Sequence, residues 1–485
     1  MTLEDSPARA VSLKSGILTA GGIALIVVAA AAPLGLIAGY GPLGFLVGGI
    51  GAPAGFLVAG IVLALFVVGI LAMARYIGRP GTFYAYVGEA LGPAAGTAAA
   101  ALAIVAYLVI NIGGIGIVSS TTENLIHVVT GVDVPWWILG LLITAVTWYV
   151  CRRGIDVGVK VLVVLLVAEV GILIIIAIAV LAKTAVGHLS FASFAPSNVF
   201  TPGMAAAALV WFGAYFGIES TTIYRSEAKN PNRTIPRATA FSLAFLALFY
   251  CFVAWAIAQA FSVPELQAAI AKNPTAMIYL IGDHYVGPWA GLTAQTLLVT
   301  SSIASGIAYF NAVSRYGHSM AADGILPGSA MRVHPKFRSP SFGNVQALIM
   351  AGVVLLFGLF RLDPYLQLTV WFSSPGTLGL ISLMALASLA VAVFFFARPR
   401  EGLSTGRRVF LGIIAATAAL LLASVVILMV VNIELLTGAG GLLNTIVVIV
   451  PVVIFVVAFV TSTVRRRTAR RNVDQTVPVP EGEGA

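Results

Sequence analysis

Charged residues are scarce in this chain of 485 residues. They make up 9% of the sequence, while hydrophobic residues make up 60%. Soluble domains carry about 25% charged residues. The composition therefore excludes an ordinary soluble protein and indicates an all-α polytopic membrane protein.

Cysteine and histidine are also rare. The two cysteines, Cys151 and Cys251, lie in or at the ends of apolar runs and far apart in the sequence, so neither a disulfide framework nor a metal-ligand spacing follows. The five histidines lie near the ends of runs or in loops, and no two of them form a ligand pair. We therefore expect no metal site and no cofactor.

Motifs for catalysis and for nucleotide hydrolysis are missing. The apolar runs contain no metal-ligating histidine pair, no Ser-Lys pair and no Asp-Asp pair, which argues against a membrane-embedded enzyme. The Gly-x-x-x-x-Gly-Lys loop that cradles phosphates does not occur either, which argues against a primary pump.

Long apolar runs are abundant instead. About 20 apolar residues cross a bilayer, and marking such runs predicts twelve spans. Residues 1–12 lack the basic start of a cleaved signal, so we expect the first run to stay in the mature protein. The runs cover about 14–40, 45–74, 93–126, 135–151, 157–183, 202–227, 237–262, 285–319, 341–360, 364–396, 408–435 and 441–464.

The distribution of basic residues predicts the orientation. Twelve spans place both termini on one side, and with the termini in the cytoplasm 24 of the 27 lysines and arginines fall in cytoplasmic segments. This bias follows the positive-inside rule. It predicts a multi-pass protein of the cytoplasmic membrane with both termini inside, and it explains the net charge of +9 without nucleic acid. The basic tail, residues 465–485, is expected to contact anionic lipid.

Two of the runs are interrupted near the middle. The first contains Pro33 and Gly35, and the sixth contains Gly217. Proline removes a backbone donor, and glycine permits a helix to open. The interrupted runs begin two groups of five, residues 13–183 and 202–396, and matching interruptions in two halves are typical of an inverted-repeat transporter with its site at the midplane. An ordinary proline kink is the alternative at Pro33. The last two runs, within residues 408–464, lie outside both groups and are expected to be peripheral helices.

Two carboxylates, Glu169 and Glu219, are the only acids placed near the centre of a run. A charge there costs about 2.5–3.5 kcal/mol, so it is usually retained for a pathway or a partner. Glu219 lies on an interrupted segment, and we assign it to gating and loop geometry. Glu169 lies on an unbroken run, and since burial disfavours a charged carboxyl, we expect it to carry a proton. The alternatives for Glu169 are a sodium ligand together with Ser301 or Ser305, or a structural hydrogen bond.

Residues 215–237 carry a longer pattern. They read aromatic-Gly-aliphatic-Glu-Ser, then Glu-x-Lys-Asn-Pro-x-Arg-x-Ile-Pro-Arg. This order resembles the sixth transmembrane helix and following loop of amino acid permeases in the amino acid-polyamine-organocation (APC) superfamily. Weaker matches are Gly-x-x-Tyr-x-Tyr at 81–86 and Asp-Gly-x-x-Pro at 323–327.

The resemblance covers the chain from about Leu13 to Arg466. It implies a leucine-transporter-type fold with twelve transmembrane helices, a 5+5 inverted repeat, broken helices 1 and 6, and alternating access. Many of these permeases have a Gly-Ser-Gly-like triplet in helix 1 whose amides receive the substrate carboxylate. Here Ala30 to Pro33 take that place. Pro33 removes one donor, although the alanines still have backbone amides to offer.

The substrate site is expected at the two interruptions, together with Asn111 of the third run. The alternative for Asn111 is a packing contact between helices. We expect the aromatic walls to be Phe212, Tyr215 and Phe216. The complete set of expected binding residues is Ala31, Ala32, Pro33, Leu34, Gly35, Asn111, Phe212, Tyr215, Phe216, Gly217, Ile218, Glu219 and Ser220.

The sequence therefore predicts a secondary active transporter of amino acids or related small amines. Its coupling ion is a proton or sodium, with a proton favoured, and the expected state is a monomer or homodimer. A polyamine or organic-amine transporter and an amino acid exchanger are the alternatives within transport. From another class, a proton-channelling subunit of a membrane complex is disfavoured because no lysine lies near the centre of any run.

Overall fold

Helices dominate the described part of the chain. The computed structural model describes residues 19–77, 83–154, 159–184, 189–218, 228–260, 263–322, 326–337, 339–397 and 403–476. The α-helices are α1 (Ala20–Ala30), α2 (Gly41–Gly48), α3 (Ala52–Met73), α4 (Phe83–Leu91), α5 (Pro93–Thr130), α6 (Trp136–Arg153), α7 (Val159–Lys183), α8 (Pro196–Val199), α9 (Pro202–Ala206), α10 (Ala208–Gly213), α11 (Pro231–Ala258), α12 (Val263–Lys272), α13 (Met277–Tyr285), α14 (Pro288–Ala322), α15 (Phe342–Leu359), α16 (Val370–Ala397), α17 (Thr405–Val431), α18 (Ile433–Thr437) and α19 (Leu442–Thr476).

Nine helical stretches among the described residues are long and apolar enough to cross a membrane. The chain is thus an all-helical membrane protein, as its composition predicts. The count of twelve spans stays a prediction. The nine are Gly35–Met73, Pro93–Thr130, Val163–Lys183, Pro231–Ala258, Pro288–His318, Phe342–Leu359, Pro364–Ala397, Thr405–Val431 and Leu442–Thr468.

The first predicted span is interrupted where the sequence indicates. Helix α1 ends at Ala30, and the chain resumes as the π-helix η1 (Gly35–Tyr40). The predicted end at residue 40 is wrong, because the helical stretch continues to the end of α2 at Gly48. Pro42 lies in the first turn of α2, directly after the π-helix. Gly49, with φ of +65°, then turns the chain into α3.

The sixth predicted span consists of two short helices. Helix α9 ends at Ala206 and α10 at Gly213, and turns follow as far as Ile218. Residues 219–227 lie outside the described part of the chain. The helical segment therefore stops close to the predicted interruption at Tyr215 to Ser220.

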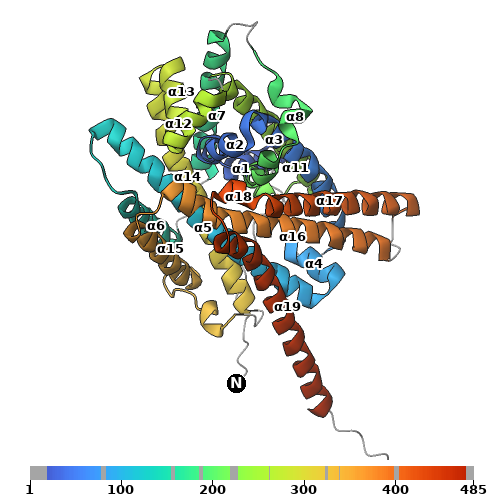
Figure 1. The fold of residues 1–485 in the computed structure, drawn as a ribbon. Helices are drawn as coiled ribbons and strands as arrows, with labels where there is room; N and C mark the ends of the chain where they lie inside the picture. Colours follow the sequence, from blue (N-terminus) through green and yellow to red (C-terminus); the bar gives the residue numbers. More distant parts are fainter. Residues whose placement is uncertain are drawn as a thin grey trace, which may run out of the picture.

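The long helices α5 and α16 form the centre of the bundle. Helix α16 packs on one side against α5 and on the other against α17, and Figure 1 shows α16 and α17 lying side by side. Helix α3 packs against both α11 and α17. Helix α19 packs against α5 and α16 and then extends beyond the rest of the bundle (Figure 1). Along α19, Val452 and Val457 are more than half exposed, as expected for a surface that faces lipid.

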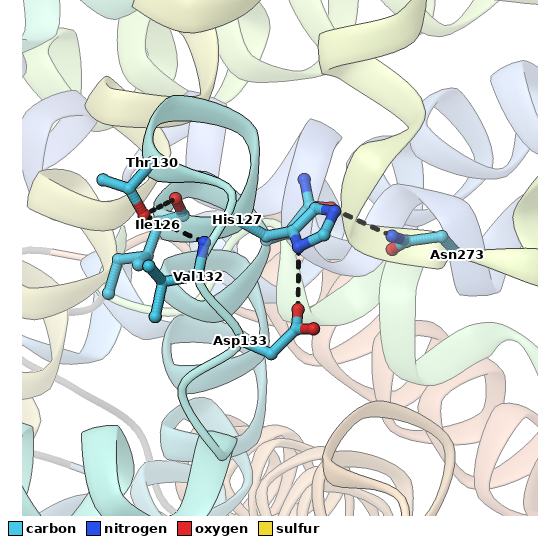
Figure 2. Close-up of polar contacts among 7 residues, drawn as sticks. Ile126, His127, Thr130, Val132, Asp133 and Asn273 are labelled. Atoms are coloured by element: carbon cyan, nitrogen blue, oxygen red, sulfur yellow. Dashed lines mark hydrogen bonds and ion pairs between the residues drawn. The ribbon is translucent and has the colours of Figure 1, made fainter.

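Helix α5 ends in a tight polar turn. Gly131 adopts a left-handed conformation and its N–H bonds to the carbonyl oxygen of His127. Figure 2 shows Nδ1 of His127 at 2.7 Å from Oδ1 of Asp133, and the hydroxyl of Thr130 donating to the carbonyl oxygen of Ile126. Both members of the His127–Asp133 pair are mostly exposed, so the pair contributes little to stability.

Candidate functional site

A cavity of about 110 Å³ lies where the two interrupted segments meet α5, α6, α14 and α16. From the first segment it is lined by residues of the break and of η1, and from the second by residues of α10 and the turn after it. The lining is formed by Ala31, Ala32, Gly35, Leu36, Tyr40, Ile110, Asn111, Gly114, Ile115, Ile117, Val118, Ile143, Thr147, Leu209, Gly213, Phe216, Ser302, Ile303, Ser305, Gly306, Tyr309, Ser373 and Thr377.

The backbone at the first break is already hydrogen-bonded. The N–H of Ala31 donates to the carbonyl oxygen of Val27, and that of Ala32 donates to Ala29, both at 3.1 Å. Ala32 has φ of +45°, a conformation that is uncommon for residues with a side chain. The amides of Ala31 and Ala32, expected to receive a substrate carboxylate, are thus engaged in this conformation.

Glu169 lies directly behind the first break. Its Oε2 accepts a hydrogen bond of 3.2 Å from the backbone N–H of Leu34, and the Ser301 side chain also bonds to this carboxylate. The residue is 4% exposed and is not part of the cavity lining. The hydroxyl of Tyr250 reaches the carbonyl oxygen of Ala31 at 3.5 Å on the same side of the break. Glu169 therefore joins α7, α14 and the first interrupted segment.

At the second break, two neighbouring aromatic residues have different surroundings. Phe216 lines the cavity, whereas Tyr215 is fully buried and its hydroxyl donates to the carbonyl oxygen of Phe56 at 2.5 Å. Gly217 follows with φ of +101°, which favours glycine. Glu219 and Ser220, both predicted site residues, lie outside the described residues.

The polar groups of the cavity are hydroxyls and one amide. The hydroxyl groups of Tyr40 and Ser373 share a hydrogen bond, with 3.2 Å between their oxygens. Among the described residues, the amide of Asn111 makes a weak contact of 3.9 Å from Nδ2 to the sulfur of Met350. Among the described lining residues none carries a charge. This part of the cavity therefore suits a solute without a charged side chain.

A row of tyrosines begins at the cavity. The ring of Tyr309, which lines the cavity, lies 5.9 Å from that of Tyr107. Tyr107 stacks on Tyr316 at 6.1 Å, and Tyr316 meets Tyr84 of α4 edge to face at 6.0 Å. The row of rings therefore extends from the cavity to α4.

The structure gathers part of the predicted site around the cavity. Ala31, Ala32, Gly35, Asn111, Phe216 and Ser305 line it. The described residues of the predicted site that do not line the cavity are Pro33, Leu34, Phe212, Tyr215, Gly217, Ile218, Glu169 and Ser301.

Sequence reasoning did not assign several lining residues to the site. Thr147 and Tyr309 stand in apolar runs without any local irregularity. Tyr40 stands between Gly39 and Gly41, and Thr377 follows Ser-Ser-Pro-Gly, but only the packing of separate helices brings these residues together. Ser373 had a signal, since it opens the Ser-Ser-Pro-Gly interruption of an otherwise apolar run.

Similar proteins have been identified over parts of the chain. The branched-chain amino acid permease of Bacillus subtilis is 27% identical over 200 residues, which are 39% of this chain and 37% of that protein. The methylthioribose transporter of the same organism is 22% identical over 262 residues, 53% of this chain and 52% of that protein. Cationic amino acid transporter 5 of Arabidopsis thaliana is 27% identical over 185 residues, 38% of this chain and 30% of that protein. The chain thus matches about half or less of the length of these relatives.

A family model covers far more of the chain. The model described as "Amino acid permease" matches residues 22–475, a range that includes both interrupted segments, Glu169 and every residue of the cavity lining. This match also identifies the chain as a transporter rather than an enzyme. The chain belongs to the amino acid permease family of the APC superfamily.

Proposed function

We propose that this protein is a secondary active transporter of α-amino acids with apolar side chains, working by alternating access. The observation that carries the proposal is the cavity between the two interrupted segments. A helix opened at membrane depth is tolerated where it lines a cavity, and paired interruptions of this kind are typical of a substrate site near the midplane.

The proposed architecture is that of the leucine-transporter type. Residues 13–183 and 202–396 form two inverted five-helix repeats, and residues 408–464 add two peripheral helices. Twelve spans would place both termini in the cytoplasm, in line with the bias of basic residues. The exposed apolar residues along α17 and α19 support their peripheral position and leave a monomer or homodimer open.

The substrate class follows from the lining. Side chains such as Ile110, Ile117 and Leu209 supply apolar contact, while Ser305 and Asn111 supply hydrogen bonds. A cationic side chain or a polyamine would need a carboxylate in the cavity, and a buried cation without one is costly. In the alternative of a polyamine transporter, Glu219 would supply this carboxylate.

Coupling is assigned to Glu169. An ionised carboxylate accepts hydrogen bonds from the Leu34 amide and from Ser301, whereas a protonated carboxyl is a weaker acceptor. Gain and loss of a proton at Glu169 would therefore loosen and tighten the first break. Sodium held by Glu169 with Ser301 is the alternative coupling ion, and amino acid exchange is the alternative mode.

Purified protein in liposomes tests the proposal. A panel of amino acids and polyamines is offered with a proton or a sodium gradient imposed separately. We expect leucine-like amino acids to accumulate above their external concentration when the proton gradient is present. Accumulation of polyamines alone, or of neither class, would overturn the proposal.

A further inference from the structure

A second hollow of the molecule is an apolar groove on its outer surface. It has a volume of about 760 Å³ and lies between α3, α11 and α17. It arises because α3 packs against both α11 and α17, while α11 and α17 have little contact with each other. The groove is separate from the central cavity, since no described residue lines both.

Small and large apolar residues both line the groove. Gly60 and Ala64 of α3 line the groove together with Ala240, Ala244 and Ala247 of α11, and a Cβ at Gly60 would lie 2.9 Å from the Cβ of Ala247. Ala240 and Ala244 are exposed. The full lining is Leu57, Gly60, Ile61, Ala64, Val67, Val68, Leu71, Ala72, Arg75, Tyr76, Pro236, Ala240, Leu243, Ala244, Ala247, Leu248, Leu403, Arg407 and Leu411.

The length of the groove matches a lipid chain. Its α11 residues extend from Pro236 to Leu248, which at 1.5 Å per residue is about 18 Å of helix. This is roughly the length of the acyl chain of a membrane phospholipid, since two such chains span a hydrocarbon core of about 30 Å. An extended hydrocarbon chain therefore fits the groove along its axis.

One end of the groove is positively charged. Arg75 follows the last turn of α3, and Arg407 lies in the first turn of α17. Both are exposed, and among the described residues neither makes an ion pair. Tyr76 lies beside them with 39% of its surface exposed, and tyrosine is enriched at the membrane surface. Two guanidinium groups next to an apolar groove complement an anionic headgroup with a chain attached.

We infer that this groove is a binding site for one phospholipid with an anionic headgroup. Arg75 and Arg407 hold the phosphate, and one acyl chain lies over Gly60, Ala64 and Ala244. The lipid joins α3, which contacts the second interrupted segment through the bond from Tyr215 to Phe56, to the peripheral helix α17.

Lipid binding to purified, delipidated protein tests the inference. Phosphatidylglycerol and phosphatidylcholine with the same acyl chains are added in turn, and bound lipid is counted by native mass spectrometry alongside thermal stability. We expect one phosphatidylglycerol to be retained and to raise the melting temperature saturably, with phosphatidylcholine at least tenfold weaker. Equal retention of the two lipids would overturn the inference.

Two variants locate the site. Arg75→Gln with Arg407→Gln should weaken the binding of phosphatidylglycerol about fivefold for each arginine removed. Arg332→Gln with Lys336→Gln, two exposed basic residues outside the groove lining, should leave it unchanged. Ala244→Trp, which keeps both arginines and fills the groove, should also prevent retention, while Ala145→Trp on the exposed face of α6 should not. Wild-type retention in either groove variant, or an equal loss when Arg332 and Lys336 are replaced, would contradict this site.

Discussion

The backbone N–H of Leu34 donates a hydrogen bond of 3.2 Å to Oε2 of Glu169, 135 positions further along the chain. This bond ties an intact helix to the point where the first membrane segment is interrupted. It makes Glu169 the one acid among the described residues whose charge acts directly on the break, although the residue stays outside the cavity.

Glu169→Gln tests the coupling assignment. Glutamine keeps the size and an oxygen acceptor for the Leu34 amide, but it cannot titrate. We expect uphill, proton-driven uptake to be lost, while substrate affinity and exchange across liposomes with equal pH stay within about threefold of wild type. Glu169→Asp, which still titrates, should retain part of the uphill uptake. Wild-type accumulation by Glu169→Gln under a pH gradient would make Glu169 structural.

Tyr215→Phe and Phe216→Ala test whether these adjacent residues, both predicted to form the walls of the site, have different roles. The Tyr215 hydroxyl bonds to the Phe56 carbonyl away from the cavity, so its removal should lower the unfolding free energy by about 1 kcal/mol and leave affinity unchanged. Phe216 lines the cavity, so Phe216→Ala should reduce affinity. Thermal unfolding and substrate titration measure the two effects. Loss of affinity in Tyr215→Phe would return Tyr215 to the binding site.

The sequence could predict the interruptions but not the direction of these side chains. Pro33 and Gly217 mark breaks because the chemistry of proline and glycine acts locally. After Gly213 the helical period ends, so the spacing of Phe212, Tyr215 and Phe216 no longer says which face each occupies. The contact of Glu169 with Leu34 depends on how two distant helices pack, which no local pattern contains. The same is true of Tyr40 and Tyr309 in the cavity.

Gly113→Ala should affect the stability of the protein, whereas Gly114→Ala should affect substrate affinity. A Cβ at Gly113 would lie 2.9 Å from the carbonyl oxygen of Thr369 and 3.1 Å from the nitrogen of Ser373, whereas a Cβ at Gly114 meets nothing within 4 Å. Gly113→Ala should thus cost about 1–3 kcal/mol of stability through overpacking of α5 against α16.

Gly114 lines the cavity, so its alanine variant should fold normally and narrow the space for the substrate. We expect the affinity for branched side chains to fall about tenfold relative to that for alanine. Unfolding curves and competition binding with amino acids of increasing size measure both variants. Equal stability of the two variants would show that α5 and α16 do not pack closely at Gly113.

His127→Ala provides a prediction of no effect. The pair with Asp133 is exposed and lies at the end of α5, away from the cavity. We expect the unfolding free energy to change by less than about 0.5 kcal/mol and uptake to be unchanged. A marked loss of uptake would assign this turn a part in the transport cycle.

Labelling of a single cysteine tests whether the cavity opens alternately to the two sides of the membrane. The chain has only Cys151 and Cys251, so Ser305→Cys in a chain with both replaced by alanine puts one thiol in the cavity. A membrane-impermeant thiol reagent is applied from either side of oriented vesicles, with and without leucine. If the cavity opens alternately, the thiol is labelled from both sides and leucine protects it. Labelling from one side only, or labelling that leucine does not slow, would contradict it.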